Sequence, residues 1–273
     1  MCVPGCQEIV ARTLSRRAFF RGASAGAIGA AFTAAQVSPV MAATPARFEK
    51  VVDLTHTLSA EFPTFDGKPG IAVNKKYDIA KDGYNLNEWV IQEHTGTHMD
   101  APLHFTKDGL SADALPVDKL VVPVAVIDIT EKAASNPDYQ LSLDDIAAYE
   151  RQHGAIPAGA CVALRSGWDK FVNDPKFRNA DASGVMHFPG FHPDAVKALI
   201  DRNVAGVAVD TLSLDHGASK DFAFHVAWLG SGRWGLEGVA NLDQLPPSGA
   251  TLVVGGPKIK GATGGPSRLL ALV

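Results

Sequence analysis

A short segment rich in histidine sets the strongest constraint on how this chain folds. Three histidines, His94, His98 and His104, and one carboxylate, Asp100, fall within eleven consecutive residues. Neutral imidazole and carboxylate are among the ligands that Zn²⁺ and Mn²⁺ prefer in proteins. The segment therefore predicts a metal site. The alternative is a loop whose histidines lie on the surface or pack in the core.

The spacing of these residues predicts a turn between His94 and His98. In a flat strand the two residues would lie about 13 Å apart, at about 3.3 Å per residue, which is too far for two imidazoles on one ion. Gly96 supplies the backbone freedom for the turn. Asp100 can then complete a three-ligand face with an open position for water. A proline follows Asp100 closely and limits any helix there, so we expect His104 near the metal but not bound to it.

The first 43 residues predict an export signal that is removed. Residues 15–20 read Ser-Arg-Arg-Ala-Phe-Phe, a twin-arginine pattern, and small residues at 40–43 resemble a cleavage site. The apolar stretch between them, residues 22–35, is too short and too rich in glycine for a good membrane span. We therefore expect residues 44–273 to form one domain in the periplasm or outside the cell. The alternative is a cytosolic protein with a basic arm.

The net charge of the exported domain limits the kinds of partner that it can bind, and its cysteine content limits its disulfides. Residues 1–42 hold four Arg and one Glu, so their removal changes the formal net charge from −4 to −7. An acidic domain without a basic cluster argues against nucleic acid and against stable membrane association. Cys161 is the one cysteine outside the signal, so we expect no internal disulfide.

The remaining chain alternates strand-like and helix-like segments. Short runs rich in Val, Ile and Leu predict strands at 50–54, 86–93, 121–129, 161–165, 204–209 and 251–254. Ser142 as N-cap and Gly154 as terminator predict a helix over 142–153, and Pro193 near a helix start predicts a second over 192–202. Strands mixed with few helices predict a single α/β domain, a curved sheet or barrel with helices outside.

Ligands from one loop rarely build a whole pocket, so we expect a distant contribution. His225 and Glu237 are the candidates, because each is a polar residue inside an apolar stretch, and buried polar groups need a partner. Each could equally be a hydrogen-bonded core residue. Asp210 and Asp215 follow a hydrophobic strand, and we expect both to be structural.

The segment from His94 to Phe105 resembles the signature of the metal-dependent cyclase family, which includes bacterial kynurenine formamidases and isatin hydrolases. The resemblance continues through residues 164–168, 188–191 and 206–215 and through 225–237. It therefore covers most of the chain after Val51. It implies a mixed α/β fold with a flattened β-barrel core, and a homodimer or homotetramer.

The same resemblance implies a division of the metal ligands. His94, His98 and Asp100 would hold one divalent ion, Zn²⁺ or Mn²⁺. Asp100, His225 and Glu237 would serve a second ion in a member that binds two.

Within the family pattern, His104 would be the catalytic histidine. A metal with an open position activates water, and a nearby unligated imidazole can move protons. We therefore expect hydrolysis of a C–N amide bond in a small molecule, either a linear formamide or a cyclic amide or imide. The alternatives are a lactone or ester hydrolase, a cyclase on the same metal centre, and a periplasmic metal-binding protein without turnover.

One segment departs from the formamidase pattern. Members that act on N-formylkynurenine usually carry a Trp-Pro-Gly-Asp-like stretch after the first strand, whereas residues 62–70 lack that tryptophan. This difference favours another amide as substrate. Phe62, Phe65 and Trp89 could line a pocket, and core packing is the equal alternative for each.

Overall fold

The computed structural model describes residues 48–273, and the predicted export signal lies outside them. The strands are β1 (Val51–Asp53), β2 (Ile71–Tyr77), β3 (Leu86–Ile91), β4 (His98–Asp100), β5 (Val121–Asp128), β6 (Gln140–Leu141), β7 (Cys161–Arg165), β8 (Gly190–Phe191), β9 (Gly206–Val209), β10 (Trp234–Glu237), β11 (Thr251–Gly255), β12 (Gly264–Pro266) and β13 (Arg268–Leu272). The α-helices are α3 (Ile79–Asp82), α4 (Thr130–Ser135), α5 (Leu143–His153), α6 (Ala195–Asp201) and α7 (Ala223–Gly230). Short 3-10 helices span Pro102–His104, Ala112–Ala114, Val117–Lys119, Asp169–Phe171, Pro175–Phe177 and Leu242–Gln244.

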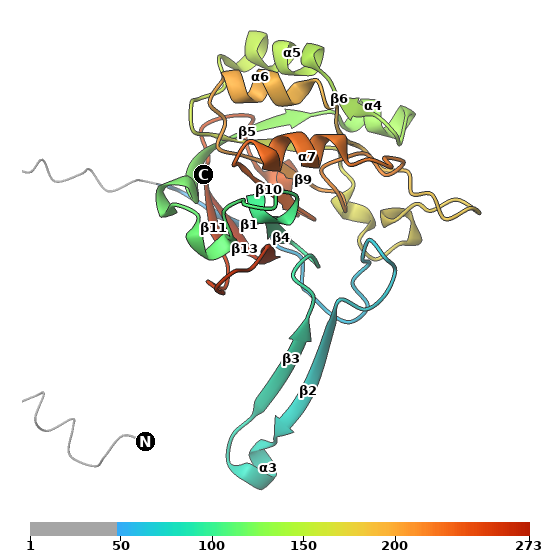
Figure 1. Ribbon diagram of the computed structural model, residues 1–273, viewed down its shortest axis with the longest axis vertical. Helices are drawn as coiled ribbons and strands as arrows, with labels where there is room; N and C mark the ends of the chain where they lie inside the picture. The colour runs from blue at the N-terminus through green and yellow to red at the C-terminus, as the bar shows by residue number, and fades with distance from the viewer. Residues whose placement is uncertain (1–47) are drawn as a thin grey trace, which may run out of the picture. The chain divides into compact units, whose positions relative to one another are not determined.

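Nine strands form one mixed, curled sheet in the order β1-β13-β11-β5-β7-β9-β10-β4-β12 (Figure 1). The central run from β5 through β7 and β9 to β10 is parallel, and the flanking pairs are antiparallel. The sheet is a half-barrel with few helices, which confirms the predicted α/β class with its curled, barrel-like core.

The central strands are apolar on both faces because two cores enclose them. Alternate residues of a strand point to opposite faces. On β5, Val124 and Val126 therefore join the core inside the curl, while Ala125 and Ile127 join the core under the helices. Burial on both sides explains the near-continuous Val, Ile and Leu runs that predicted these strands.

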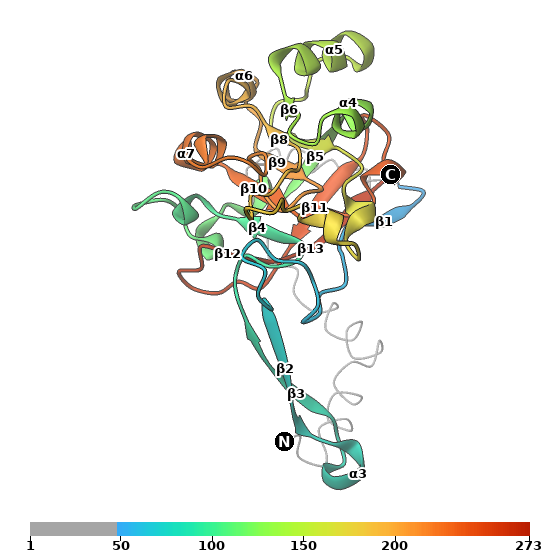
Figure 2. The same ribbon diagram turned by 90° about the vertical axis from the view of Figure 1, so that its right-hand side faces the viewer.

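The helices α4 to α7 lie on one side of the sheet, at the top of Figures 1 and 2. Helix α5 begins as predicted: the Ser142 side chain accepts from the Asp145 N–H, and the Asp145 carboxylate accepts from the Ser142 N–H. The second predicted helix is shorter than expected and begins at Ala195. Helix α7 was not predicted, because its apolar residues follow no clear 3.6-residue period. Among residues 48–273, no helix has the length and apolar character to cross a membrane.

A two-stranded hairpin, β2–β3 with α3 at its tip, projects away from the half-barrel (Figure 2). We call residues Ile71–Ile91 the arm. The predicted strand at 86–93 belongs to this arm and not to the main sheet. Every arm residue after Ile71 is exposed or half-exposed, and none of α3 is buried. Isolated hairpins are marginally stable in water, and within residues 48–273 the large apolar side chains of this one after Ile71 stay uncovered.

Candidate metal centre

The predicted turn forms the first part of the centre. Gly96 has a φ of +67°, a left-handed value that favours glycine. The turn brings the imidazole rings of His94 and His98 to 5.3 Å between centroids. His98 and Asp100 then fall two residues apart on β4, so both side chains point to the same face of the strand.

The distant residues arrive through the sheet and through α7. Strand β10 pairs antiparallel with β4, and its last residue, Glu237, lies directly opposite His98. His225 projects from the first turns of α7. His98, Asp100, His225 and Glu237 are all buried. The structure therefore places His225 and Glu237, from the far part of the chain, beside His98 and Asp100.

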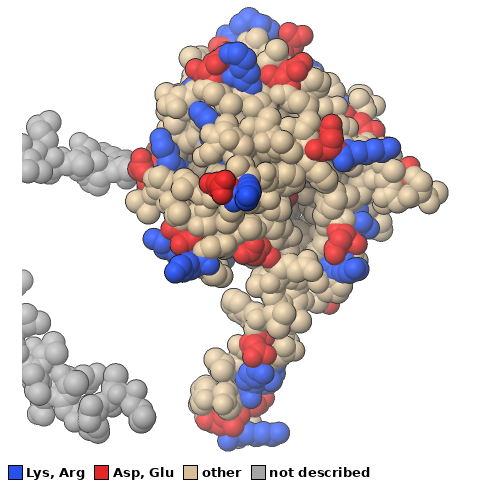
Figure 3. Space-filling view, viewed as in Figure 1, with Lys and Arg blue, Asp and Glu red and all other residues tan. Residues whose placement is uncertain are grey.

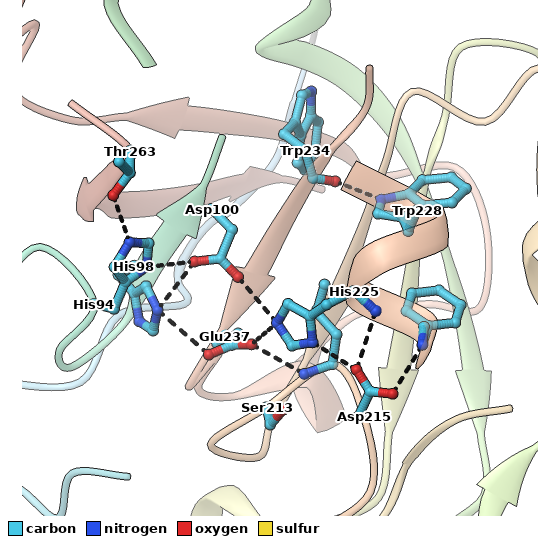
Figure 4. Close-up of polar contacts among 12 residues, drawn as sticks. His94, His98, Asp100, Ser213, Asp215, His225, Trp228, Trp234, Glu237 and Thr263 are labelled. Atoms are coloured by element: carbon cyan, nitrogen blue, oxygen red, sulfur yellow. Dashed lines mark hydrogen bonds and ion pairs between the residues drawn. The ribbon is translucent and has the colours of Figure 1, made fainter. Parts of the chain in front are cut away.

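These four side chains form a tight ring, which Figure 4 shows. Nε2 of His98 lies 3.4 Å from Oδ1 of Asp100 and 3.3 Å from Oε2 of Glu237. Nε2 of His225 lies 2.9 Å from Oε1 of Glu237 and 3.4 Å from Oδ2 of Asp100. Each imidazole therefore faces both carboxylates through the same nitrogen.

Hydrogen bonds on the outer side decide which nitrogen carries the proton. Nδ1 of His98 lies 2.9 Å from the carbonyl oxygen of Gly96, which can only accept, so Nδ1 is the donor. Nδ1 of His225 lies 2.6 Å from Asp215, whose carboxylate also accepts from the backbone N–H groups of Phe224 and His225. In the neutral rings, both Nε2 atoms therefore turn lone pairs toward carboxylate oxygens.

Lone pairs of the imidazole nitrogens therefore face lone pairs of the carboxylate oxygens, with no positive charge between them. Nε2 of His98 and Oδ2 of Asp100 are buried and have no hydrogen-bond partner. Unpaired buried polar atoms of this kind are costly unless a proton or a metal ion lies between them. Imidazole and carboxylate donors suit Zn²⁺ or Mn²⁺, so the residues fit a divalent ion.

The pKa shifts of these residues also indicate that the site favours a positive charge. Burial lowers the pKa of His98, but the carboxylates of Asp100 and Glu237 outweigh it and raise the pKa to about 10. The pKa of His225 is also raised, because Asp100, Asp215 and Glu237 outweigh its burial. Burial raises the pKa of Asp100, but the three neighbouring imidazoles hold it well below the usual range.

Asp100 is shared by two groups of candidate ligands. Ligand atoms of His98, Asp100 and Glu237 lie within 4.8 Å of one another, and so do those of His94, Asp100 and His104. The grouping differs from the one that the family resemblance implied, since Glu237 rather than His94 accompanies His98. Nδ1 of His94 lies 2.7 Å from Oδ1 of Asp100.

His104 lies beside the ring of ligands, on the short 3-10 helix that Pro102 begins. Its imidazole stacks on that of His94, with 3.6 Å between centroids and 18° between planes. Burial lowers the pKa of His104, and the charge of Asp100 opposes this only in part. His104 is therefore a neutral imidazole at neutral pH. Its predicted role as a catalytic group rather than a ligand remains a prediction.

A cavity of about 250 Å³ opens onto the centre. His94, His98, His104, His225 and Glu237 line its polar end. Its aromatic walls are Phe65, Phe105 and Phe222, whose neighbouring rings lie 5.8 to 5.9 Å apart. The cavity therefore combines a charged floor with apolar walls, as small-molecule sites usually do.

The three aromatics singled out in the sequence have different fates. Phe65 lines the cavity. Phe62 packs in a small core cluster with Trp168 and Phe177. Trp89 lies on the arm and is 69% exposed.

The family model described as "Putative cyclase" matches residues 52–216. An isatin hydrolase from Roseibium aggregatum is 37% identical over 243 residues, which cover 82% of this chain and 92% of that protein. The chain belongs to the cyclase family. A kynurenine formamidase from Salinibacter ruber is 33% identical over 67% of this chain and 78% of its own length.

Solved structures agree with this membership. A crystal structure of an isatin hydrolase with the product analogue thioisatinate has a TM-score of 0.77 and 37% identity, over 82% of this chain and 92% of that one. A structure described as a potential metal-dependent hydrolase with cyclase activity has a TM-score of 0.62 and 26% identity, over 81% of this chain and 96% of that one.

Asp210 and Asp215, both expected from the sequence to be structural, have different roles in the fold. Asp210 accepts hydrogen bonds from the backbone N–H groups of Ser166, Gly167 and Trp168, which is a structural role. Asp215 instead holds Nδ1 of His225. Both residues follow the buried strand β9, and the sequence offers no signal to distinguish them, because the contact with His225 depends on where α7 begins.

Proposed function

We propose that this cyclase-family chain is a metal-dependent hydrolase that cleaves the C–N bond of a cyclic amide fused to an aromatic ring. The observation that carries the proposal is the ring of four buried imidazole and carboxylate side chains, in which His98 Nε2 and Asp100 Oδ2 have no partner, beside a cavity that aromatic side chains also line. The isatin hydrolase with 37% identity supports it, since isatin is such a cyclic amide.

His94, His98, Asp100, His225 and Glu237 would hold the metal. One or two ions of Zn²⁺ or Mn²⁺ fit the donors, since Asp100 belongs to both candidate groups. A divalent ion at this place supplies a Lewis acid for the amide carbonyl and favours deprotonation of water.

His104 moves the protons of the reaction. Its ring is neutral at neutral pH, so it can take a proton from the attacking water and give it to the departing nitrogen. The stacking on His94 orients the ring, and its place in the cavity lining puts it within reach of a bound substrate. The outward hydrogen bonds of His98 and His225 keep their own N–H groups away from the reacting atoms.

The aromatic walls orient the substrate ring. Phe105 and Phe222 meet at 52° and Phe65 and Phe222 at 50°, so they present tilted faces to an aromatic guest. A fused bicyclic amide would lie between these rings with its carbonyl toward the imidazole and carboxylate side chains. A linear formamide is the second candidate, because a kynurenine formamidase is also a relative.

The test is a hydrolysis assay with isatin, N-formylkynurenine, a cyclic imide and a lactone. We expect isatin to be hydrolysed fastest, and the His104→Ala variant to show that turnover comes from this site. Faster hydrolysis of the lactone would support the ester-hydrolase alternative. Metal binding without hydrolysis of any compound would contradict the proposed function and favour a metal-binding protein.

We propose that the mature enzyme begins near residue 44 and works in the periplasm or outside the cell. The support is the sequence pattern alone, namely the twin arginines Arg16 and Arg17 before an apolar stretch and a small-residue site. Fusion of residues 1–43 to a reporter that is active only after export tests it.

We propose further that the enzyme is a homodimer or homotetramer assembled through the arm. Among residues 48–273, eight of the seventeen exposed large hydrophobic residues lie on it: Val73, Tyr77, Ile79, Tyr84, Leu86, Trp89, Val90 and Ile91. The arm stands clear of the half-barrel in Figure 3, where charged side chains lie near its tip among uncharged ones. Exposed apolar surface of this density marks a contact with another protein surface.

A further inference from the structure

We infer that Glu93 and Thr263 are positioning residues, which set the tautomer and the direction of His94 and thereby the metal affinity of the centre. The inference rests on the proposed metal-dependent function. The juxtaposition behind it is a hydrogen-bonded chain of three side chains, from the root of the arm, through the loop before β12, to His94.

The direction of this chain follows from donors and acceptors. Oε2 of Glu93 lies within hydrogen-bond distance of both the backbone N–H and the hydroxyl of Thr263. A carboxylate oxygen that faces two such donors accepts from both, so the single hydroxyl proton of Thr263 points to Glu93. Oγ1 of Thr263 is then left as an acceptor.

That acceptor decides the proton on His94. Nε2 of His94 lies 2.9 Å from Oγ1 of Thr263 and must donate to it. In the neutral ring, Nδ1 therefore carries the lone pair, and it lies 2.7 Å from Oδ1 of Asp100. Two acceptors at that distance repel unless a cation lies with them, so His94 is turned toward the metal through Nδ1.

Two neighbouring groups fix the position of the His94 imidazole. His104 stacks on it at 3.6 Å. A Cβ atom at Gly264 would lie 2.6 Å from Cε1 of His94, so only glycine lets β12 approach the ring this closely. The backbone oxygen of Thr263 accepts from the N–H of Ala101, which ties the loop to the end of β4.

Without Glu93, Thr263 could donate a hydrogen bond to His94 instead of accepting one from it. A hydroxyl released from the carboxylate can donate to Nε2 of His94, and the ring proton then moves to Nδ1, where it bonds to Asp100. That tautomer cannot offer Nδ1 to a metal. Glu93 thus makes the chain one-directional, because a carboxylate cannot donate.

The test compares metal affinity in Thr263→Val, Thr263→Ser and Glu93→Gln by competition with a chromogenic chelator, with Zn²⁺ and Mn²⁺ as probes. Outer hydrogen-bond partners of metal ligands typically change affinity by about 10- to 100-fold. We expect a loss of that size for Thr263→Val, restoration by Thr263→Ser, and an intermediate loss for Glu93→Gln. Thr55→Val is the matched control, since its half-buried hydroxyl bonds to Leu269 and does not touch the centre.

A spectroscopic measurement separates positioning from general destabilisation. In the Zn²⁺-loaded protein, ¹⁵N NMR should show a proton on Nε2 of His94 and none on Nδ1. A proton on Nδ1, unchanged affinity in Thr263→Val, or an equal loss in Thr55→Val would overturn the inference. If the unaltered protein binds no metal, the proposed function fails instead, so the two failures are distinguishable.

Discussion

The metal centre and the arm each contain groups without a partner: polar groups at the centre and apolar groups on the arm. At the centre, polar atoms of His98 and Asp100 are buried without partners. On the arm, Trp89 and Val90 are 69% and 61% exposed without apolar cover. Buried lone pairs are stabilised by a cation, whereas exposed apolar surface is stabilised by another apolar surface. The two regions therefore differ in the partner that we propose for each, an ion at the centre and a second copy of the chain at the arm.

The largest expected effect is loss of the shared ligand. Asp100→Asn removes the charge that faces His94, His98 and His225. We expect affinity for Zn²⁺ or Mn²⁺ to fall more than about 100-fold, beyond what outer partners cause, and hydrolysis to become undetectable. Isothermal titration with each metal measures this.

Asp210→Asn is the matched control for that variant. Both carboxylates are fully buried, but that of Asp210 is paired with hydrogen-bond donors of the protein itself. Metal affinity should therefore be unchanged in Asp210→Asn. An equal loss in both variants would mean that the effect reports damage to the fold.

The next effect concerns His104, whose ring lies within reach of both His94 and Asp100. If His104 moves protons, His104→Ala should lower kcat by about 10²- to 10⁴-fold and leave the metal content intact. Elemental analysis and steady-state kinetics on the same sample decide the matter. Loss of metal together with activity would show that His104 is a ligand.

Sequence patterns predicted the inner part of the centre better than its surroundings. The turn at Gly96 and the His98–Asp100 pair follow from local spacing, so they could be predicted. The pairing of Glu237 with His98 depends on the register of β10 against β4, and the Thr263 contact depends on β12. Such long-range pairings leave no periodic signal in a single sequence.

The fold shows the same division. Strands β5 and β7 were predicted closely because burial on both faces makes them continuously apolar. Four of the six residues of β3 are also apolar, yet this strand lies on the exposed arm. Apolar composition therefore predicted a strand without showing which surface covers it. The arm is the region where that ambiguity matters.

A smaller effect is expected on assembly. Trp89→Ser combined with Val90→Ser removes two large apolar side chains, each worth about 1.5 kcal/mol or more when buried. The dissociation constant of the oligomer should therefore rise by about 100-fold or more. Sedimentation velocity over a range of concentrations measures it.

Val117→Ser is the control for the arm, because Val117 is as exposed as the arm residues but lies elsewhere. It should leave association unchanged. A monomeric unaltered protein at high concentration would contradict the assignment of the arm to assembly.

The smallest effect is on the free energy of unfolding. It concerns the buried carboxylate of Asp210, which is paired with hydrogen-bond donors of the protein and needs no ion. Burial, with help from the charge of Asp169, raises the pKa of Asp210 to about 7 from its ordinary value of 3.8, although hydrogen bonds from Ser166 and Trp168 oppose the shift. Because the folded pKa is the higher one, the contribution to stability is complete below pH 3.8 and is lost as the pH rises toward 7.

The measurement is urea unfolding at several pH values between 4 and 7. In that window the unaltered protein should lose stability relative to Asp210→Asn, by at most about 1.4 kcal/mol per pH unit. Parallel pH profiles in the two proteins would show that Asp210 does not titrate there.

We propose that the ring of His98, Asp100, His225 and Glu237 needs a divalent ion for hydrolysis. The most direct test measures metal content and isatin hydrolysis on one sample, before chelation, after dialysis against EDTA, and after return of Zn²⁺ or Mn²⁺. We predict at least one ion per chain at the start, loss of ion and activity together, and recovery of both. Undiminished hydrolysis by the metal-free protein would show that the reaction needs no ion at this centre.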